Sequence, residues 1–230
     1  MSFGSDNRSG ASAAVLDALV QEFSQNGGSY GADASTLRAE TKLREVFDCD
    51  LSAFFVTSGT GGMRLVPVAP FVARLDAASV AAHIRAMPDD SPHNIRPQVL
   101  SIAQASENGQ VYSVSEVQAL CDAARTAGLR VHMDGARFAN AVAHLGCHPA
   151  DVSVRAGVDV LCLGATKNGA VAAEAVVFFD KPLARGFAAR VKRSGHLLSK
   201  GRLLGAQFGA WLDDGHWLNL ARHANGQAQR

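Results

Sequence analysis

Two side chains able to do chemistry stand at the ends of apolar segments. Lys167 follows the apolar run 161–164, and Asp134 closes the run that begins at Leu129. A lysine amine at the mouth of a site can form a Schiff base when burial or a cationic neighbour favours its neutral form. A carboxylate there can hold a ring N–H and keep a pyridine ring protonated. The plainer alternatives are a surface lysine that reaches water for Lys167 and a helix N-cap for Asp134.

An arginine and a loop of small residues add to this chemistry. Arg137 could present its planar guanidinium to a substrate carboxylate, or form a surface ion pair of little energetic weight. Ser58, Gly59 and Thr60 follow another apolar segment and supply the N–H groups and hydroxyls that bind a phosphate monoester. This loop is not a nucleotide-binding P-loop, because no Gly-Lys-Ser/Thr follows it. Taken together, these residues predict a pyridoxal 5'-phosphate site.

Alternating apolar and amphipathic segments must position these residues. Short apolar segments predict strands at 53–57, 65–68, 99–102, 129–133, 158–163 and 176–179. Helical spacing predicts helices at 12–23, 36–47, 76–87, 115–127, 138–145, 182–193 and 196–213. The alternation predicts an α/β fold, a mostly parallel sheet with helices on both faces. Ligands of such sheets bind beyond the carboxyl ends of the strands, so Asp134, Lys167 and the 58–62 loop are expected in one crevice.

Composition limits the partners and the compartment. The chain has 230 residues, 47% of them hydrophobic, and a formal net charge of +1, which gives no reason to expect nucleic acid or an anionic membrane as partner. We expect no transmembrane helix and no signal peptide in residues 1–10. Four cysteines without CxxC spacing indicate free thiols in a reducing, cytoplasmic location, and no metal cluster is expected.

Motifs along almost the whole chain resemble those of low-specificity L-threonine aldolases, which are fold-type I pyridoxal phosphate enzymes. The matching stretches are 5–7, 30–33, 57–60, 132–141, 164–169 and 199–202. The most specific are the run His132-Met133-Asp134-Gly135-Ala136-Arg137 and the run Gly164-Ala165-Thr166-Lys167-Asn168-Gly169. The resemblance implies the large, cofactor-binding domain of such an enzyme and an amino acid as the small-molecule substrate.

The resemblance also implies a role for each candidate residue. Lys167 would carry the Schiff base, Asp134 would pair with the ring nitrogen, and Arg137 would reach the cofactor and the substrate carboxylate. Ser58, Gly59 and Thr60 would hold the phosphate, and Ser5 would contact the substrate carboxylate. Glu107 falls where some relatives have a histidine near the substrate hydroxyl, so it either does proton work or is a plain loop residue. Arg202 would approach the phosphate of a neighbouring subunit, which implies a homo-oligomer, a dimer or tetramer, with shared active sites.

The same resemblance implies a division of the chain and a reaction. Residues 1–25 would be an N-terminal arm and helix, 26–210 the large domain, and 211–230 the start of a connection to a C-terminal small domain. Relatives carry a segment of several dozen residues after the phosphate loop, with a histidine that stacks on the cofactor. We therefore expect a gap at 60/61, either in the sequence as given or in the protein itself.

The expected reaction is retro-aldol cleavage of L-threonine, L-allo-threonine and related β-hydroxy-α-amino acids to glycine and an aldehyde. Alternatives within the fold are a β-eliminating lyase and an aldolase that prefers aryl-serines. An alternative of another class is an inactive, shortened homologue that serves as an oligomeric scaffold.

Overall fold

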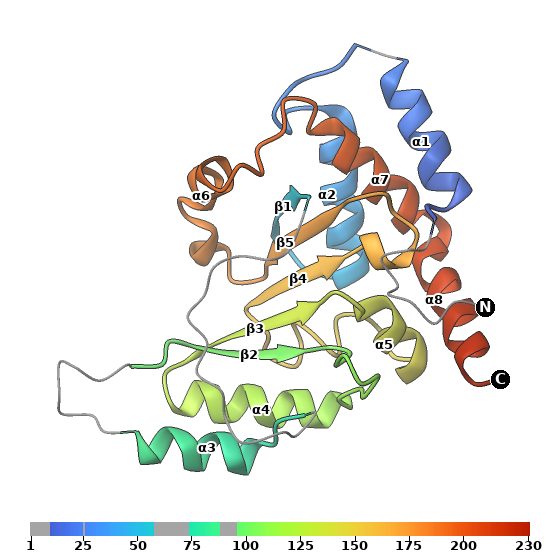
Figure 1. Cartoon of the computed structure of the whole chain (residues 1–230). Helices are drawn as coiled ribbons and strands as arrows, with labels where there is room; N and C mark the ends of the chain where they lie inside the picture. The colour runs from blue at the N-terminus through green and yellow to red at the C-terminus, as the bar shows by residue number, and fades with distance from the viewer. Residues whose placement is uncertain (1–9, 25, 58–73, 88–95) are drawn as a thin grey trace.

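The computed structural model describes residues 10–24, 26–57, 74–87 and 96–230. The predicted strand 65–68 and the candidate residues Ser5, Ser58, Gly59 and Thr60 lie outside these ranges. In the described part, five strands form one sheet in the order β1-β5-β4-β3-β2 (Figure 1). The strands are β1 (Ser52–Val56), β2 (Val99–Ala103), β3 (Arg130–Gly135), β4 (Val160–Gly164) and β5 (Glu174–Phe178).

The sheet is mostly parallel, as predicted, with one strand reversed. β2, β3 and β4 pair in parallel, whereas β5 pairs antiparallel with both β4 and β1. β1 therefore runs in the same direction as β2, β3 and β4. In Figure 1 the arrowheads of β2, β3 and β4 all point towards α5 (Phe138–Leu145) and α8 (His216–Ala228). The first residue of β5, Glu174, consequently lies at the edge where these three strands end.

Helices cover both faces of the sheet, and aromatic rings mark both contacts. On one face, α7 (Arg202–Leu212) places Phe208 against Phe55 of β1, with 4.9 Å between ring centroids. The aromatic cluster continues through Trp211 and Trp217 of α8. On the other face, α6 (Phe187–Arg193) places Phe187 at 5.0 Å from Phe54 of β1. Alternation along the strand thus sends Phe54 and Phe55 to opposite layers.

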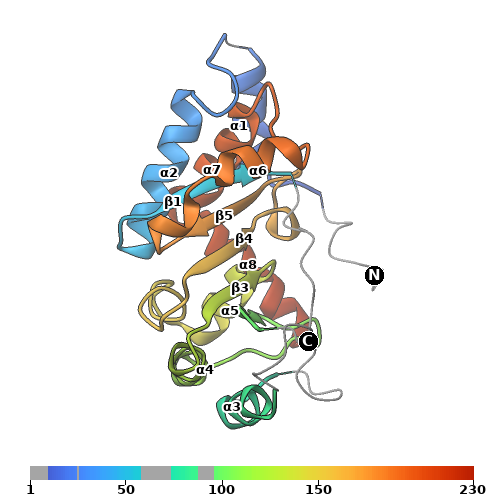
Figure 2. The same ribbon diagram turned by 90° about the vertical axis from the view of Figure 1, so that its left-hand side faces the viewer.

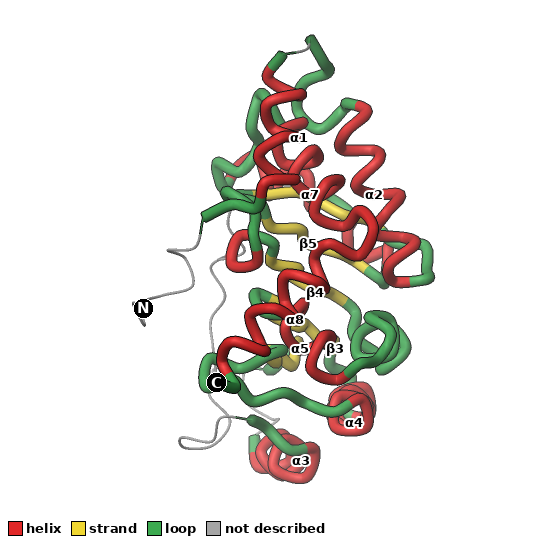
Figure 3. The backbone as a smooth tube through the Cα atoms, turned by 90° about the vertical axis from the view of Figure 1, so that its right-hand side faces the viewer, coloured by secondary structure: helices red, strands yellow, loops and turns green. Residues whose placement is uncertain are grey.

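The remaining helices lie at the two ends of the sheet. α1 (Ala13–Phe23) and α2 (Ala34–Phe47) pack on α7 near β1, and α3 (Ala77–Ala86) packs on α4 (Val114–Thr126) at the β2 end. The turned view separates these two groups clearly (Figure 2). From the opposite side, α7 and α8 follow one another along the sheet (Figure 3). No helix among the described residues is both long and apolar enough to cross a membrane.

Capping residues explain where several helices begin. Asp33 accepts a hydrogen bond from the Thr36 amide at 2.8 Å, so α2 begins at Ala34, two residues before its predicted start. Asp76 caps α3 by accepting a hydrogen bond from the Ser79 amide at 2.8 Å. In α4, Ser113 and Glu116 form a reciprocal capping box, which starts the helix at Val114.

One predicted helix is interrupted by a residue with positive φ, and another begins later than predicted. The segment predicted as 182–193 is a short 3-10 turn followed by α6, and Gly186, at φ 75°, separates the two. The helix predicted from residue 196 begins only at Arg202. Asp214, at φ 49°, then divides α7 from α8. Left-handed residues end a helix whatever the apolar spacing around them.

Candidate active site

Asp134 and Lys167 come from adjacent parallel strands. Asp134 is the penultimate residue of β3 and lies opposite Cys162 of β4. Lys167 follows the last residue of β4, Gly164, by three positions and sits in the 3-10 turn Thr166–Asn168. Because β3 and β4 run in the same direction, both residues lie at the carboxyl edge of the sheet. This is the edge at which open α/β sheets bind their ligands.

Asp134 is exposed and is not the cap of the following helix. Its Oδ1 accepts a hydrogen bond from the Ala136 amide at 3.0 Å, which fixes the turn after β3. The N-cap position of α5 belongs to Arg137, and no side chain makes a cap hydrogen bond there. The N-cap alternative for Asp134 is therefore wrong. Arg137 is half-buried at this helix start, beside the strand end that carries Asp134.

Backbone contacts of its two neighbours fix the turn that carries Lys167. Thr166 Oγ1 accepts from the Ala173 amide at 3.1 Å, and this ties the turn to the residue before β5. Asn168 is buried and donates from Nδ2 to the Trp217 carbonyl oxygen at 2.9 Å. The indole of Trp211 donates to the Asn168 carbonyl oxygen at 2.8 Å. The half-buried Lys167 thus stands between two anchored residues, unlike a lysine on a loose surface loop.

A chain of polar side chains lies on the same sheet face as Asp134. Ser101 Oγ lies 2.9 Å from His132 Nδ1, and His132 Nε2 lies 3.3 Å from Cys162 Sγ. Burial lowers the pKa of His132, although the charge of Asp134 opposes this. Burial also raises the pKa of the Cys162 thiol to about 12, and Asp134 and Glu174 add to the rise. The thiol therefore stays protonated at neutral pH, which argues against a Cys–His nucleophile.

Glu174 is an acidic residue at this edge that the sequence interpretation did not include. It begins β5, pairs with Gly164 and is half-buried. Burial raises the pKa of its carboxyl, while the neighbouring Thr166 and the charge of Lys167 oppose the rise. The charges of both Lys167 and Asp134 act on Glu174, so these three groups share one electrostatic environment. The sequence offered no signal for Glu174, since only the reversed direction of β5 brings it here.

Two glycines let the ends of β3 and β4 pack closely together. A Cβ atom on Gly164 would lie 2.8 Å from the Ala136 Cα and 2.9 Å from Glu174 Oε2. A Cβ on Gly135 would lie 2.7 Å from Leu161 Cδ1 and 2.8 Å from the Cys162 carbonyl oxygen. The ends of β3 and β4 therefore approach each other more closely than any other residue type would allow.

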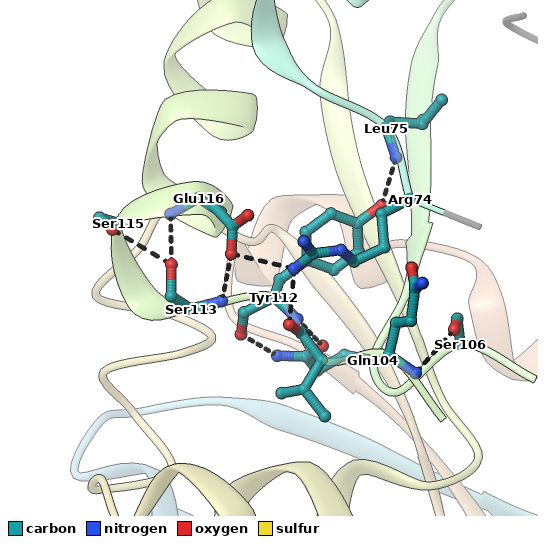
Figure 4. A network of polar contacts seen from close by, with 10 residues as sticks. Arg74, Leu75, Gln104, Ser106, Tyr112, Ser113, Ser115 and Glu116 are labelled. Carbon is teal, nitrogen blue, oxygen red and sulfur yellow. Dashed lines mark hydrogen bonds and ion pairs between the residues drawn. The ribbon is translucent and has the colours of Figure 1, made fainter. Parts of the chain in front are cut away.

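Glu107 lies in an exposed turn beyond the carboxyl end of β2. The buried Gln104 closes this loop, because its side chain accepts from the Tyr112 amide at 3.0 Å and donates to the Tyr112 carbonyl oxygen at 2.8 Å. Tyr112 Oη in turn accepts from the Leu75 amide, and Arg74 stacks on the ring (Figure 4). The network holds the loop that carries Glu107, but no contact joins Glu107 to Asp134 or Lys167 in the described residues.

Arg202 lies away from this edge, at the start of α7. Its side chain is 12% exposed, and its Nε lies 3.6 Å from Glu22 Oε2 of α1, too far for a hydrogen bond. Within the described residues this buried Nε has no hydrogen-bond partner.

The last described residue before the predicted phosphate loop is Thr57, whose Oγ1 lies 3.1 Å from Nδ1 of His196. His196 is a second residue at the site's border that sequence reasoning missed.

Comparison with known proteins gives the family. A family model described as beta-eliminating lyase matches residues 61–230. A low specificity L-threonine aldolase of a Pseudomonas species is 35% identical over 264 residues, which cover 99% of this chain and 76% of that protein. Its Pseudomonas aeruginosa counterpart is also 35% identical, over 97% of this chain and 75% of that protein. Since each alignment is longer than the chain, these relatives carry residues that have no counterpart here.

Solved structures give the same fold. A Leishmania major threonine aldolase superposes with a TM-score of 0.89 at 24% identity, over 99% of this chain and 76% of that one. A Thermus thermophilus aspartate aminotransferase superposes with a TM-score of 0.70 at 14% identity, over 96% of this chain and 71% of that one. Both likenesses bear on the fold, which is that of the fold-type I enzymes. The chain therefore belongs to the beta-eliminating lyase family, with low specificity L-threonine aldolases as its sequence relatives.

Proposed function

We propose that this protein is a pyridoxal phosphate-dependent lyase that cleaves L-threonine, L-allo-threonine and related β-hydroxy-α-amino acids to glycine and an aldehyde. One observation carries the proposal: an anchored lysine and an exposed aspartate end two adjacent parallel strands. Sequence relatives named as L-threonine aldolases support it. The inactive-scaffold alternative is not favoured, because an anchored lysine turn has no use in a scaffold.

The residues of this edge fit the cofactor. Lys167 supplies the amine for a covalent Schiff base, and Asp134 supplies a carboxylate for a ring N–H. Gly135, Ala136 and Gly164 are small residues at the ends of β3 and β4, next to Asp134 and the lysine turn. Arg137 stands beside Asp134 for the carboxylate of the substrate. The predicted phosphate ligands Ser58, Gly59 and Thr60, and the predicted substrate ligand Ser5, lie outside the described residues.

The bound cofactor supplies an electron sink for the carbanion that bond cleavage leaves on the amino acid. The chain's own groups position the substrate and move protons. In the proposed reaction the β-hydroxyl loses its proton, the Cα–Cβ bond breaks, the aldehyde leaves, and Cα takes up a proton to give glycine. Glu107 is the proposed group near the substrate hydroxyl, on the loop that the Gln104–Tyr112 hydrogen bonds hold closed.

We also propose that the protein is a homo-oligomer with shared active sites. α1 packs on α7 through the fully buried Val15 and leaves Leu16, Val20 and Phe23 at 47%, 65% and 61% exposure. An apolar stripe at helical spacing indicates a covered face. Arg202, whose Nε forms an ion pair with Glu22 of this helix and has no hydrogen-bond partner among the described residues, is the residue proposed to meet the phosphate of a second copy. Free cysteines at all four positions support a reducing compartment, for which we propose the cytoplasm.

Absorbance and product analysis test the proposed function. Adding pyridoxal phosphate should produce a Schiff-base band, and Lys167→Ala should abolish it, while Lys181→Ala, which removes a lysine paired with Asp50, should leave it unchanged. Threonine should yield glycine and acetaldehyde. Pyruvate and ammonia would instead indicate β-elimination, and turnover of aryl-serines alone would indicate the aryl-serine aldolase. A protein without any band at saturating cofactor would contradict the proposal.

A further inference from the structure

Gln207 is a buried polar residue of α7 for which the proposed reaction has so far no use. Its side chain is 4% exposed, and its neighbours along the helix, Ala206 and Phe208, are buried and apolar. A side-chain amide in such a place costs free energy unless both its oxygen and its nitrogen find hydrogen-bond partners. The partners of Gln207 therefore show which part of the chain it serves.

The oxygen of Gln207 binds the segment that follows the lysine turn. Oε1 accepts from the Val171 amide at 2.9 Å and from the Ala172 amide at 3.3 Å. Nε2 donates to the carbonyl oxygen of Leu203, one turn earlier in α7, at 3.1 Å. Backbone N–H groups can only donate, so the atom that faces Val171 and Ala172 must be the oxygen. The orientation of the side-chain amide is thus fixed by its partners.

The segment held by Gln207 belongs to the same closed loop as Lys167. The ends of loop 165–173 are joined, because the Ala165 amide donates to the Ala173 carbonyl oxygen at 3.2 Å. Lys167 lies in the first half of this loop, and the two amides bound by Gln207 lie in the second half. Since so short a closed loop moves as one, a hold on its second half also restricts the lysine.

A second side chain of α7 holds the same loop. Trp211 follows Gln207 by four positions, so both side chains lie on one face of the helix. The indole of Trp211 donates to the carbonyl oxygen of Asn168, the residue after Lys167, at 2.8 Å. The helix α7 therefore holds the lysine loop at two points, and Gln207 provides one of them.

We propose that Gln207 is a positioning residue for Lys167: by accepting the two loop amides, it keeps the amine where it meets the aldehyde of the cofactor. The inference rests on the proposed function, in which the lysine nitrogen bonds to the aldehyde carbon and the aldehyde oxygen leaves as water. Gln207 acts through the backbone of the loop. Its loss should therefore weaken covalent capture of the cofactor more than the rest of cofactor binding.

The test compares two ligands in the full-length protein. Pyridoxal phosphate can form the Schiff base, whereas 4'-deoxypyridoxine 5'-phosphate has a methyl group in place of the aldehyde and cannot react with the lysine. Gln207→Met keeps an unbranched side chain of similar length but removes the acceptor oxygen. Gln207→Glu keeps an acceptor oxygen and serves as the rescue variant.

Ser153→Ala is the matched control. It also removes a buried side chain that bonds to the backbone, since Ser153 Oγ donates to the Pro149 carbonyl oxygen at 2.7 Å, but it lies in the connection before β4 and not in the lysine loop. Schiff-base absorbance measures binding of pyridoxal phosphate, and calorimetry measures binding of the deoxy analogue.

We expect Gln207→Met to bind pyridoxal phosphate about tenfold more weakly than the parent, the usual combined weight of two neutral hydrogen bonds. Its affinity for the deoxy analogue should stay close to that of the parent. Gln207→Glu should recover most of the loss, and Ser153→Ala should leave the ratio of the two affinities unchanged.

Hydrogen exchange tests the hold on the loop in the parent protein without cofactor. Val171 is 52% exposed, yet its amide should exchange slowly because it is bonded to Gln207. Gln207→Met should speed up exchange in the 168–173 peptide, and Ser153→Ala should not.

Equal weakening of both ligands by Gln207→Met, or no weakening of either, would overturn the inference and leave the proposed function standing. A Val171 amide that exchanges rapidly in the parent would overturn it as well, without any variant. A parent that binds the deoxy analogue but never shows the Schiff-base band would instead contradict the proposed function, and with it the task given to Gln207.

Discussion

At the scale of single residues, the candidate site depends on glycines that lack a side chain as well as on the groups that react. Gly164 separates the end of β3 from Glu174, and any side chain there would enter space that Ala136 and Glu174 already occupy. The lysine and the aspartate could be found from the sequence, because each ends an apolar run. The need for glycine at position 164 could not, because the contact joins β4, β5 and the turn after β3.

Gly164→Ala should destabilise the fold and weaken cofactor binding together. The added methyl group would meet backbone at 2.8 Å, and overpacking of this kind costs about 1–3 kcal/mol. Urea unfolding measures the change in stability, and the Schiff-base absorbance measures binding. As a control, Gly226→Ala in α8 meets no atom within 4 Å and should stabilise the protein by about 1 kcal/mol. A Gly164→Ala protein as stable as the parent would show that the two strand ends can separate.

At the scale of elements, apolar spacing predicted where most strands and helices lie, and side-chain caps decided where they begin. The predicted helix 138–145 agrees with α5 at both ends, because it starts directly after the strand turn and ends at Gly146, at φ 62°. The prediction that began a helix at residue 196 was wrong, since residues 196–201 form loop before Arg202. Apolar residues at 197 and 198 continued the helical pattern without making a helix.

Ser113→Ala should lower the stability of the α4 region. Ser113 Oγ accepts from the Glu116 amide at 3.2 Å, and Glu116 Oε2 accepts from the Ser113 amide at 2.7 Å. Loss of such an N-cap costs about 1 kcal/mol, measured as the change in free energy of unfolding. Gln118→Ala, at an exposed position of the same helix, is the control and should change stability by less than half as much. Equal effects of both variants would argue against the capping box.

The direction of a strand is another property of elements that spacing does not reveal. The sequence predicts β5 as an apolar strand near residues 176–179, and the structure contains it at Glu174–Phe178. Its reversed direction follows from the short connection that leads from the Lys167 turn directly back into the sheet. A crossover helix would be needed to keep it parallel, and the nine residues between β4 and β5 are too few for one.

At the scale of the whole molecule, helices cover both faces of the sheet, but α1 keeps an exposed apolar stripe. Leu16, Val20 and Phe23 follow one another at helical spacing and stay exposed. The sequence predicted α1 as amphipathic through these residues, but it did not show that α7 takes up only the side containing Val15. The stripe is therefore the surface on which the proposed oligomer is most directly testable.

Replacing Val20 and Phe23 together by lysine should yield a smaller species in light scattering, because charge on the stripe opposes burial against a second copy. Leu183→Lys, an apolar residue 36% exposed in a different part of the chain, is the control and should leave the mass unchanged. A parent that is already monomeric at micromolar concentration, or a double variant with the mass of the oligomer, would contradict the proposal.

The reversed strand also sets a length for the ligand. β5 lies between β1 and β4, so the end of β1 at Thr57 and the end of β4 are separated by two interstrand spacings, roughly 10 Å. A molecule that joins Lys167 to the loop after Thr57 must span about a nanometre with one reactive end and one anionic end. A free amino acid is too short for this, so the substrate alone cannot occupy both ends of the site.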